Sequence, residues 1–228
     1  MAKQQVVAYG LAAAAVAASA AVGGGVTVAQ AADLYIPEPE AAVAVPDDWT
    51  GCYVGVHAGY GWGVVEIVDD PYDFEDGFDY DIAGWLAGGQ IGCNQQIDGF
   101  AVGIEADLAL ANITGGVDDI FPEVRTDVHW LGTLRGRAGV VADPWFFYGT
   151  AGLAAAGTTS FLDIYEEDAV RYGWVAGLGA EMKLTTDISV KAEYLFHDFG
   201  DKAFNFGGAN VTDNLTLSTF KVGVNLHF

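Results

Sequence analysis

This chain of 228 residues has little basic charge, only 2 cysteines and only 6 prolines. Lysine and arginine number 9 against 31 aspartates and glutamates, which gives a formal net charge of −22. A phosphate backbone repels such a chain, so no nucleic acid is expected as a partner. Beyond the N-terminal segment, no apolar run reaches the roughly 20 residues that a transmembrane helix needs, which excludes a helical membrane protein. Charged residues make up only 18% and apolar residues 52%, so extensive disorder is excluded as well.

Motifs for catalysis, metal binding and nucleotide binding are also missing. The chain has no His-Glu-x-x-His motif, no Gly-x-Ser-x-Gly nucleophile elbow and no Gly-x-Gly-x-x-Gly turn between a strand and a helix. We therefore predict a protein that is not an enzyme and holds no cofactor. A barrel lipid hydrolase stays open as an alternative, because geometry rather than chain order defines a serine–histidine site.

The first 48 residues predict export followed by a linker. Lys3 precedes an alanine-rich apolar run, and small residues at Ala29 and Ala31 mark a cleavage site, so 1–31 is predicted to be a signal peptide. Residues 32–48 carry three of the prolines and are predicted to be an extended periplasmic linker. The folded domain is then 49–228, in a compartment where disulfides persist.

From Trp49 onward, apolar residues recur at every second position, which indicates strands rather than helices. Eight such segments of roughly ten residues match the length of a tilted strand that crosses a bilayer. The segment 145–155 is apolar on both faces, so its orientation stays open. In the fourth segment, Val128, Trp130 and Leu134 are placed together on the apolar face. The segments are 49–64, 84–95, 100–110, 128–140, 145–155, 174–182, 190–196 and 220–228.

The connections between these segments alternate in length. Long ones are expected at 65–83, 112–126, 157–171 and 198–214, and short ones near 96–98, 143–144 and 185–187. This alternation predicts an all-β fold, an eight-stranded antiparallel up-and-down transmembrane β-barrel. An even strand number puts both termini at the short-turn end, predicted to be periplasmic, with the long acidic loops extracellular. Whether the acidic segment 66–81 binds divalent cations stays open, because it lacks EF-hand spacing.

Five motifs in order make the chain resemble the porin-like outer-membrane β-barrel family, which includes the outer-membrane immunogenic proteins and shares its architecture with the OmpA barrel. They are WTGCYVG at 49–55, GGQIGCN at 88–94, WLGTLRGR at 130–137, KAEYL at 191–195 and VGVNLHF at 222–228. The resemblance implies a cell outer membrane location and insertion by the barrel-assembly machinery, which reads the terminal Phe228. It also implies structural, antigenic or porin-like roles. The two cysteines depart from the family pattern, because relatives often carry aromatic residues there.

The polar face of the strands carries equal numbers of acids and bases. An unpaired charge inside a narrow tube is costly, so we expect ion pairs between neighbouring strands that plug the barrel. An ion pathway is the alternative reading of the same set. The predicted network consists of Glu105, Asp107, Glu181 and Glu193 with Arg135, Arg137, Lys191 and Lys221.

Cys52 and Cys93 lie on the apolar faces of the first two segments. If they oppose each other, Trp62 faces Ala83, which fits the connection expected at 65–83. Directly opposed residues have Cα atoms about 4.5 or 5.5 Å apart, within reach of a disulfide. We predict that disulfide, with two free lipid-facing thiols as the alternative.

The sequence thus predicts a monomeric barrel with a structural and surface-antigen role in the envelope, and weak porin activity stays open. Outer-membrane lipid and lipopolysaccharide are its expected surroundings. A genuine small-solute channel is the first alternative. An exported soluble barrel that binds a ligand inside is the second, and it would need polar residues on its outer face.

Overall fold

In the computed structural model, the described residues are 48–69, 79–117, 124–162, 165–206 and 209–228. All of them belong to the second of two compact units, Val43–Phe228. The predicted signal peptide and residues 32–47 of the predicted linker lie outside the described residues. So do the acidic residues Asp70, Asp73, Glu75 and Asp76 of the segment 66–81.

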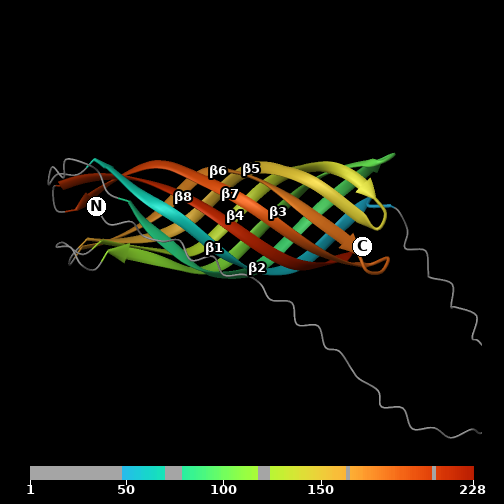
Figure 1. Cartoon of the computed structure of the whole chain (residues 1–228), viewed down its shortest axis with the longest axis horizontal. Helices are drawn as coiled ribbons and strands as arrows, with labels where there is room; N and C mark the ends of the chain where they lie inside the picture. Colours follow the sequence, from blue (N-terminus) through green and yellow to red (C-terminus); the bar gives the residue numbers. More distant parts are fainter. Residues whose placement is uncertain (1–47, 70–78, 118–123, 163–164, 207–208) are drawn as a thin grey trace, which may run out of the picture. The chain divides into compact units, whose positions relative to one another are not determined.

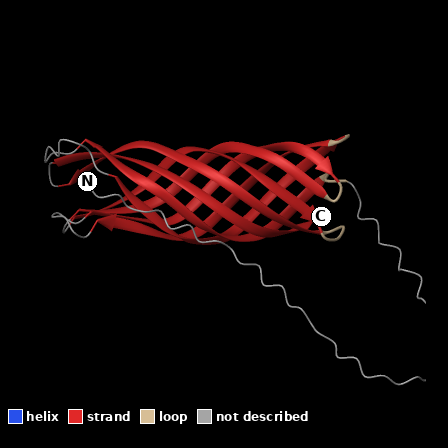
Figure 2. Ribbon diagram, viewed as in Figure 1, coloured by secondary structure: helices blue, strands red, loops and turns tan. Residues whose placement is uncertain are grey.

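Eight antiparallel strands form one closed barrel in which every strand pairs with its neighbours in sequence and β1 also pairs with β8. Figure 1 labels the eight strands of the barrel and colours them along the sequence. Figure 2 shows that the described residues are strands and loops. The predicted fold class is therefore confirmed. Within the described residues, no helix has the length and apolarity to cross a membrane. The strands are β1 (Gly51–Asp69), β2 (Asp79–Ile97), β3 (Phe100–Val117), β4 (Val124–Ala142), β5 (Trp145–Leu162), β6 (Tyr165–Lys183), β7 (Ile188–Phe206) and β8 (Ala209–His227).

The strands are 18 or 19 residues long, about twice the predicted length. All four predicted long connections are too long. β1 runs to Asp69 before β2 begins at Asp79, and β3 runs to Val117 before β4 begins at Val124. The other two are wrong as long connections: β5 runs to Leu162 before β6 begins at Tyr165, and β7 runs to Phe206 before β8 begins at Ala209. The sequence analysis set the strand ends where the alternation of apolar residues stops. The strands continue through polar residues, because the hydrogen bonds between backbones do not depend on side-chain polarity. The short turns are confirmed, and they share one end of the barrel with the C-terminus (Figure 1). We call this the turn end.

Alternation puts apolar side chains outside, as the sequence predicts, and both polar and apolar side chains inside. Outward residues such as Val56, Leu110 and Leu178 are 66%, 71% and 70% exposed. The open orientation of β5 is settled: Phe146 and Tyr148 are buried inside, while Leu153 faces outward.

One assignment was wrong. The apolar pattern predicts that Val128 faces outward, but its side chain is fully buried in the lumen. The register between β4 and β5 shifts between Val128 and Trp130, so one extra residue reverses the alternation above this point.

Candidate functional site

The lumen brings together all eight side chains of the predicted charge network. Glu105 and Asp107 on β3 are two residues apart, as are Arg135 and Arg137 on β4, so each pair points to the same inner face. β7 supplies another such pair, and β6 and β8 supply one residue each. All eight are buried, and the set is neutral with four acids and four bases.

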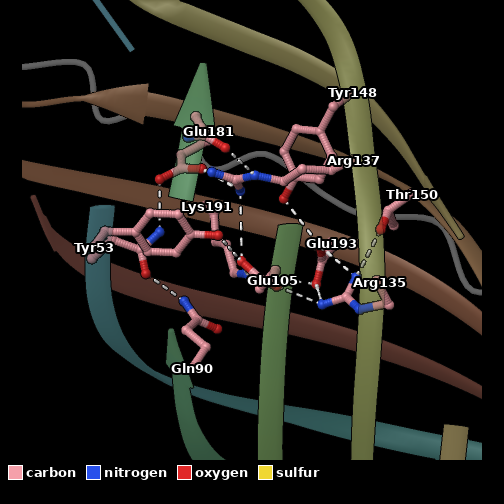
Figure 3. A network of polar contacts seen from close by, with 12 residues as sticks. Tyr53, Gln90, Glu105, Arg135, Arg137, Tyr148, Thr150, Glu181, Lys191 and Glu193 are labelled. Carbon is pink, nitrogen blue, oxygen red and sulfur yellow. Dashed lines mark hydrogen bonds and ion pairs between the residues drawn. The ribbon is translucent and has the colours of Figure 1, made fainter. Parts of the chain in front are cut away.

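Arg135 forms ion pairs with three carboxylates of this network, and Figure 3 shows it beside Glu105, Glu193 and Thr150. Its Nη2 contacts Glu105 Oε1 at 2.5 Å and Asp107 Oδ2 at 3.0 Å, and its Nη1 contacts Glu193 Oε1 at 3.0 Å. The planar fork of arginine can hold several carboxylates at once, which a point charge cannot. Its remaining donors bond the Thr133 and Thr150 hydroxyls, so the guanidinium is fully engaged.

The two lysines bridge strands that are not neighbours. Lys191 Nζ on β7 contacts both oxygens of Glu105 on β3, at 2.7 and 2.8 Å. Lys221 Nζ on β8 lies 3.2 Å from Asp107 on β3 and 3.8 Å from Glu193 on β7. The pair of Lys221 with Glu193 joins neighbouring strands, as the sequence argument expected. That argument missed the pairs of both lysines with β3, because strand adjacency says nothing of how narrow an eight-stranded barrel is.

Aromatic rings enclose the second arginine. Arg137 Nη1 contacts Glu181 Oε2 at 3.0 Å, and its guanidinium carbon lies 4.6 Å from the Tyr53 ring centre and 5.1 Å from that of Tyr148. The Tyr53 hydroxyl donates to Glu105 at 2.5 Å, and the Tyr148 hydroxyl donates to Glu193 at 3.0 Å. Sequence reasoning did not include these tyrosines in the network. Tyr53 could have been found, since it is a polar-tipped aromatic in the inward row of β1.

The turn end of the lumen is closed by a residue that precedes β1. Trp49 is 1% exposed, its ring centre lies 5.4 Å from that of Phe146, and its backbone N–H donates to Gln96 Oε1 at 2.8 Å. Lys183 Nζ lies 5.2 Å from the centre of the Trp49 ring and donates to the Asp48 carbonyl. We call Trp49, Ala101, Phe146 and Tyr148 the aromatic layer.

Asp48 lies beside this closure. Hydrogen bonds from the Thr50 hydroxyl and the Thr50 backbone amide hold the pKa of Asp48 below its ordinary value. The residue thus stays ionised next to Lys183.

The other part of the lumen holds a cluster of apolar side chains, a feature that the sequence did not predict. All eight strands contribute to this cluster, and every member is at most 6% exposed. The buried ion pair between Arg171 and Asp213 lies in the same part of the lumen, with Arg171 opposite Ala156 of the cluster. The cluster lies between the charge network and the end opposite the turns. We call this set the apolar layer: Val65, Tyr80, Ile82, Leu86, Ala109, Ile113, Val128, Leu131, Ala154, Ala156, Val175, Leu195, Phe199, Leu215 and Leu217.

A serine, a histidine and a glutamate meet near the turn end, which tests the hydrolase alternative. Ser189 Oγ donates to Glu181 Oε1 at 2.5 Å and lies 2.8 Å from His227 Nε2. Because the hydroxyl proton points to Glu181, His227 must donate to the serine, whereas a catalytic histidine would accept the proton. Asn225 and Arg137 hold the same carboxylate, so the cluster is an extension of the charge network. Among the described residues, no group of three or more His, Cys, Asp or Glu side chains could hold a metal ion.

Cys52 and Cys93 form a disulfide with Cα atoms 4.0 Å apart. The register is the predicted one, with Trp62 opposite Ala83. The backbone of Cys52 also pairs with the C-terminal residue: Phe228 N donates to Cys52 O at 2.9 Å, and Cys52 N donates to Phe228 O at 3.3 Å. The Phe228 side chain is 76% exposed on the outer face. The predicted insertion signal thus lies at the seam between β1 and β8.

The profile of the family "Outer membrane protein beta-barrel domain" matches residues 6–228. The chain is similar to the 31 kDa outer-membrane immunogenic protein of Brucella melitensis biotype 1, with 32% identity over 89% of this chain and 94% of the relative. It is also similar to a 22 kDa outer membrane protein of Rhizobium leguminosarum bv. viciae, with 30% identity over 83% and 82% of the two chains. Among solved structures, Neisserial surface protein A matches with a TM-score of 0.48 and 14% identity over 78% of this chain and 98% of that chain.

Proposed function

Because this chain belongs to the outer membrane protein beta-barrel family, we propose that it serves in the outer membrane as a closed, monomeric barrel with a structural and surface-display role. The observation that carries this proposal is the filling of the lumen. The charge network and the aromatic layer packed against it fill the turn-side part of the lumen, and the apolar layer lies beyond them. An eight-stranded barrel has an interior that side chains can fill, so no path for a solute is needed to explain its width.

The outer face supports residence in lipid. Large apolar side chains cover it from the row near the turns to the middle of the strands, including Phe100, Ile104 and Leu153, which are more than half exposed. A soluble ligand-binding barrel would expose polar side chains instead. We therefore reject the exported soluble barrel.

In this proposal the turn end faces the periplasm and the opposite end faces the medium. The even number of strands supports the placement of the start of β1 and the end of β8 on one side, because an even count returns the chain to the side where it started. Phe228 is exposed at the seam that closes the barrel, which suits recognition by the barrel-assembly machinery. The opposite end would then lie among lipopolysaccharide, and the names of the immunogenic relatives support display of this end as an antigen.

The absence of catalysis is part of the proposal. It rests on the direction of the hydrogen bond at Ser189, whose hydroxyl donates its proton to Glu181. It rests also on the burial of this serine, which is 0% exposed and so is not presented to a substrate.

Planar bilayer recording tests the closed barrel against the channel. The purified protein is first shown to be folded by its heat-modifiable band, which is the gel band of the unheated barrel that shifts when the sample is boiled. We expect this folded protein to show no stable conductance. We expect Arg135→Ala to add at most a small leak, because the apolar layer is untouched. The matched control is Arg125→Ala, since the Arg125 side chain is 50% exposed and ion-paired to Asp127 outside the charge network. A large, stable wild-type conductance whose ion selectivity changes in Arg135→Ala but not in Arg125→Ala would establish the channel instead.

A further inference from the structure

The disulfide lies on the lipid-facing surface of the first hairpin. Cys93 is exposed on the outer face of β2, and Cys52 lies directly opposite on β1. Closer to the turns than Cys93, the outer face still carries Ile97 and Phe100, each 62% exposed. The two sulfurs therefore lie in the apolar belt of the barrel near its turn-side margin, where the exposed Gln95 and Thr50 form one hydrogen-bonded polar pair beside them.

This position limits when the bond can form. Thiol–disulfide exchange needs a thiolate, and an apolar environment disfavours the charged thiolate. Once lipid covers the outer face, a water-soluble oxidant has no access to either sulfur. The embedded barrel is thus a poor substrate for oxidation.

The geometry allows the bond to form earlier, because it needs only one hairpin. The two cysteines are 41 residues apart and oppose each other on consecutive strands. Closing the barrel needs β8 to pair with β1, a contact between the two ends of the folded domain. Contacts between nearby segments have a lower loop-closure cost, so the hairpin is accessible before the seam is.

We propose that the Cys52–Cys93 bond forms in the β1–β2 hairpin before the barrel is embedded, by exchange with a water-soluble thiol–disulfide oxidant. The thiolate of one cysteine attacks the disulfide of the oxidant and forms a mixed disulfide. The thiolate of the other cysteine then displaces the oxidant. The two cysteines lose two protons and two electrons, and the oxidant leaves with both of its sulfurs reduced.

The bond has a second consequence at the seam. Cys52 is the residue whose backbone N–H and C=O both pair with Phe228. A disulfide at this residue fixes the register between β1 and β2 on one edge of β1, before β8 has paired with the other edge. The oxidised hairpin thus presents a preset strand edge to the C-terminal residue, and we expect it to accelerate closure.

Refolding into dilauroyl phosphatidylcholine vesicles tests the order of events. Reduced full-length chain is given glutathione disulfide either in urea before vesicles are added or after the heat-modifiable band has appeared. Free thiols are then counted by gel shift with a maleimide polymer. We expect oxidation to be at least tenfold slower after embedding. Equal rates in the two arms would overturn the proposed order, and failure of reduced chain to embed would support it by making the bond a prerequisite.

A matched control shows that the reagents reach embedded barrels. A Cys52→Ser/Cys93→Ser chain that carries Thr185→Cys presents one thiol in an exposed turn, and this thiol should react at the same rate before and after embedding. The effect on closure is read from the rate at which the heat-modifiable band appears. We expect oxidised chain to close several-fold faster than reduced chain, and equal rates would refute the role at the seam.

Discussion

Replacing Arg135 with methionine should destabilise the barrel more than any exposed substitution, because it leaves buried carboxylates with too few bases. Three carboxylates contact this guanidinium, at 2.5 to 3.0 Å. Two of them keep a close second partner, since Glu105 also contacts Lys191 and Asp107 also contacts Lys221. The net loss is therefore close to one uncompensated buried charge. Breaking a buried pair in this way costs about 3–5 kcal/mol of unfolding free energy.

The measurement is urea unfolding of the embedded protein, followed by tryptophan fluorescence and by loss of the heat-modifiable band. A second variant, Arg135→Met with Glu193→Gln, restores a neutral charge network. Its unfolding free energy should be about 1–3 kcal/mol higher than the sum of the two single substitutions predicts. Arg135→Lys keeps the charge but loses the fork, so its stability should fall between wild type and Arg135→Met. If Arg135→Met unfolds within about 1 kcal/mol of wild type, or if the two substitutions simply add, the lumen is hydrated and the reasoning fails.

The remaining predictions concern the two other layers and the disulfide. Trp49→Ala should cost about 3–5 kcal/mol in the same urea assay, because it empties the turn-end closure, and an unchanged midpoint would show that the indole is not packed there. Leu86→Ala should cost about 2–5 kcal/mol without creating conductance in planar bilayers, and a stable current in this variant would show that the apolar layer alone blocks ions. Cys93→Ser should lower stability by at most about 4 kcal/mol, the chain-entropy limit for this loop, and wild-type chain that was reduced before it was embedded should match it.

The sequence predicted which way most side chains point, because alternation needs only a period of two and a polar marker in each strand. Glu105 and Asp107 identify the inner face of β3, and the register of the first hairpin follows from the cysteine pair alone. Such markers fail where both faces are apolar. Leu86 in the lumen and Leu110 in the lipid are the same residue type, so composition cannot distinguish a dry lumen from a membrane-facing row.

Other features depend on the closed shape and not on any single strand. The cross-lumen contact between Lys191 and Glu105 joins β7 to β3, and no pairwise strand rule predicts it. The shift after Val128 inserts one residue into β4, and an alternating pattern read through it assigns the wrong face. The strand ends were underestimated because pairing continues past the last apolar row into residues whose polarity suggested loops.

The layers of the lumen support one another, which explains why a neutral set of charges can be held at its centre. A buried ion pair stabilises a protein only where its geometry is good and its remaining donors are satisfied, and around Arg135 and Glu193 the Thr133 and Tyr148 hydroxyls meet that condition. Burial of the eight charged side chains lowers the local dielectric, which strengthens each pair and raises the cost of separating one. In the closed barrel that we propose, an ion that entered the lumen would have to displace a paired charge and then pass the apolar layer. We therefore expect a single substitution in the lumen to lower stability before it creates a pore.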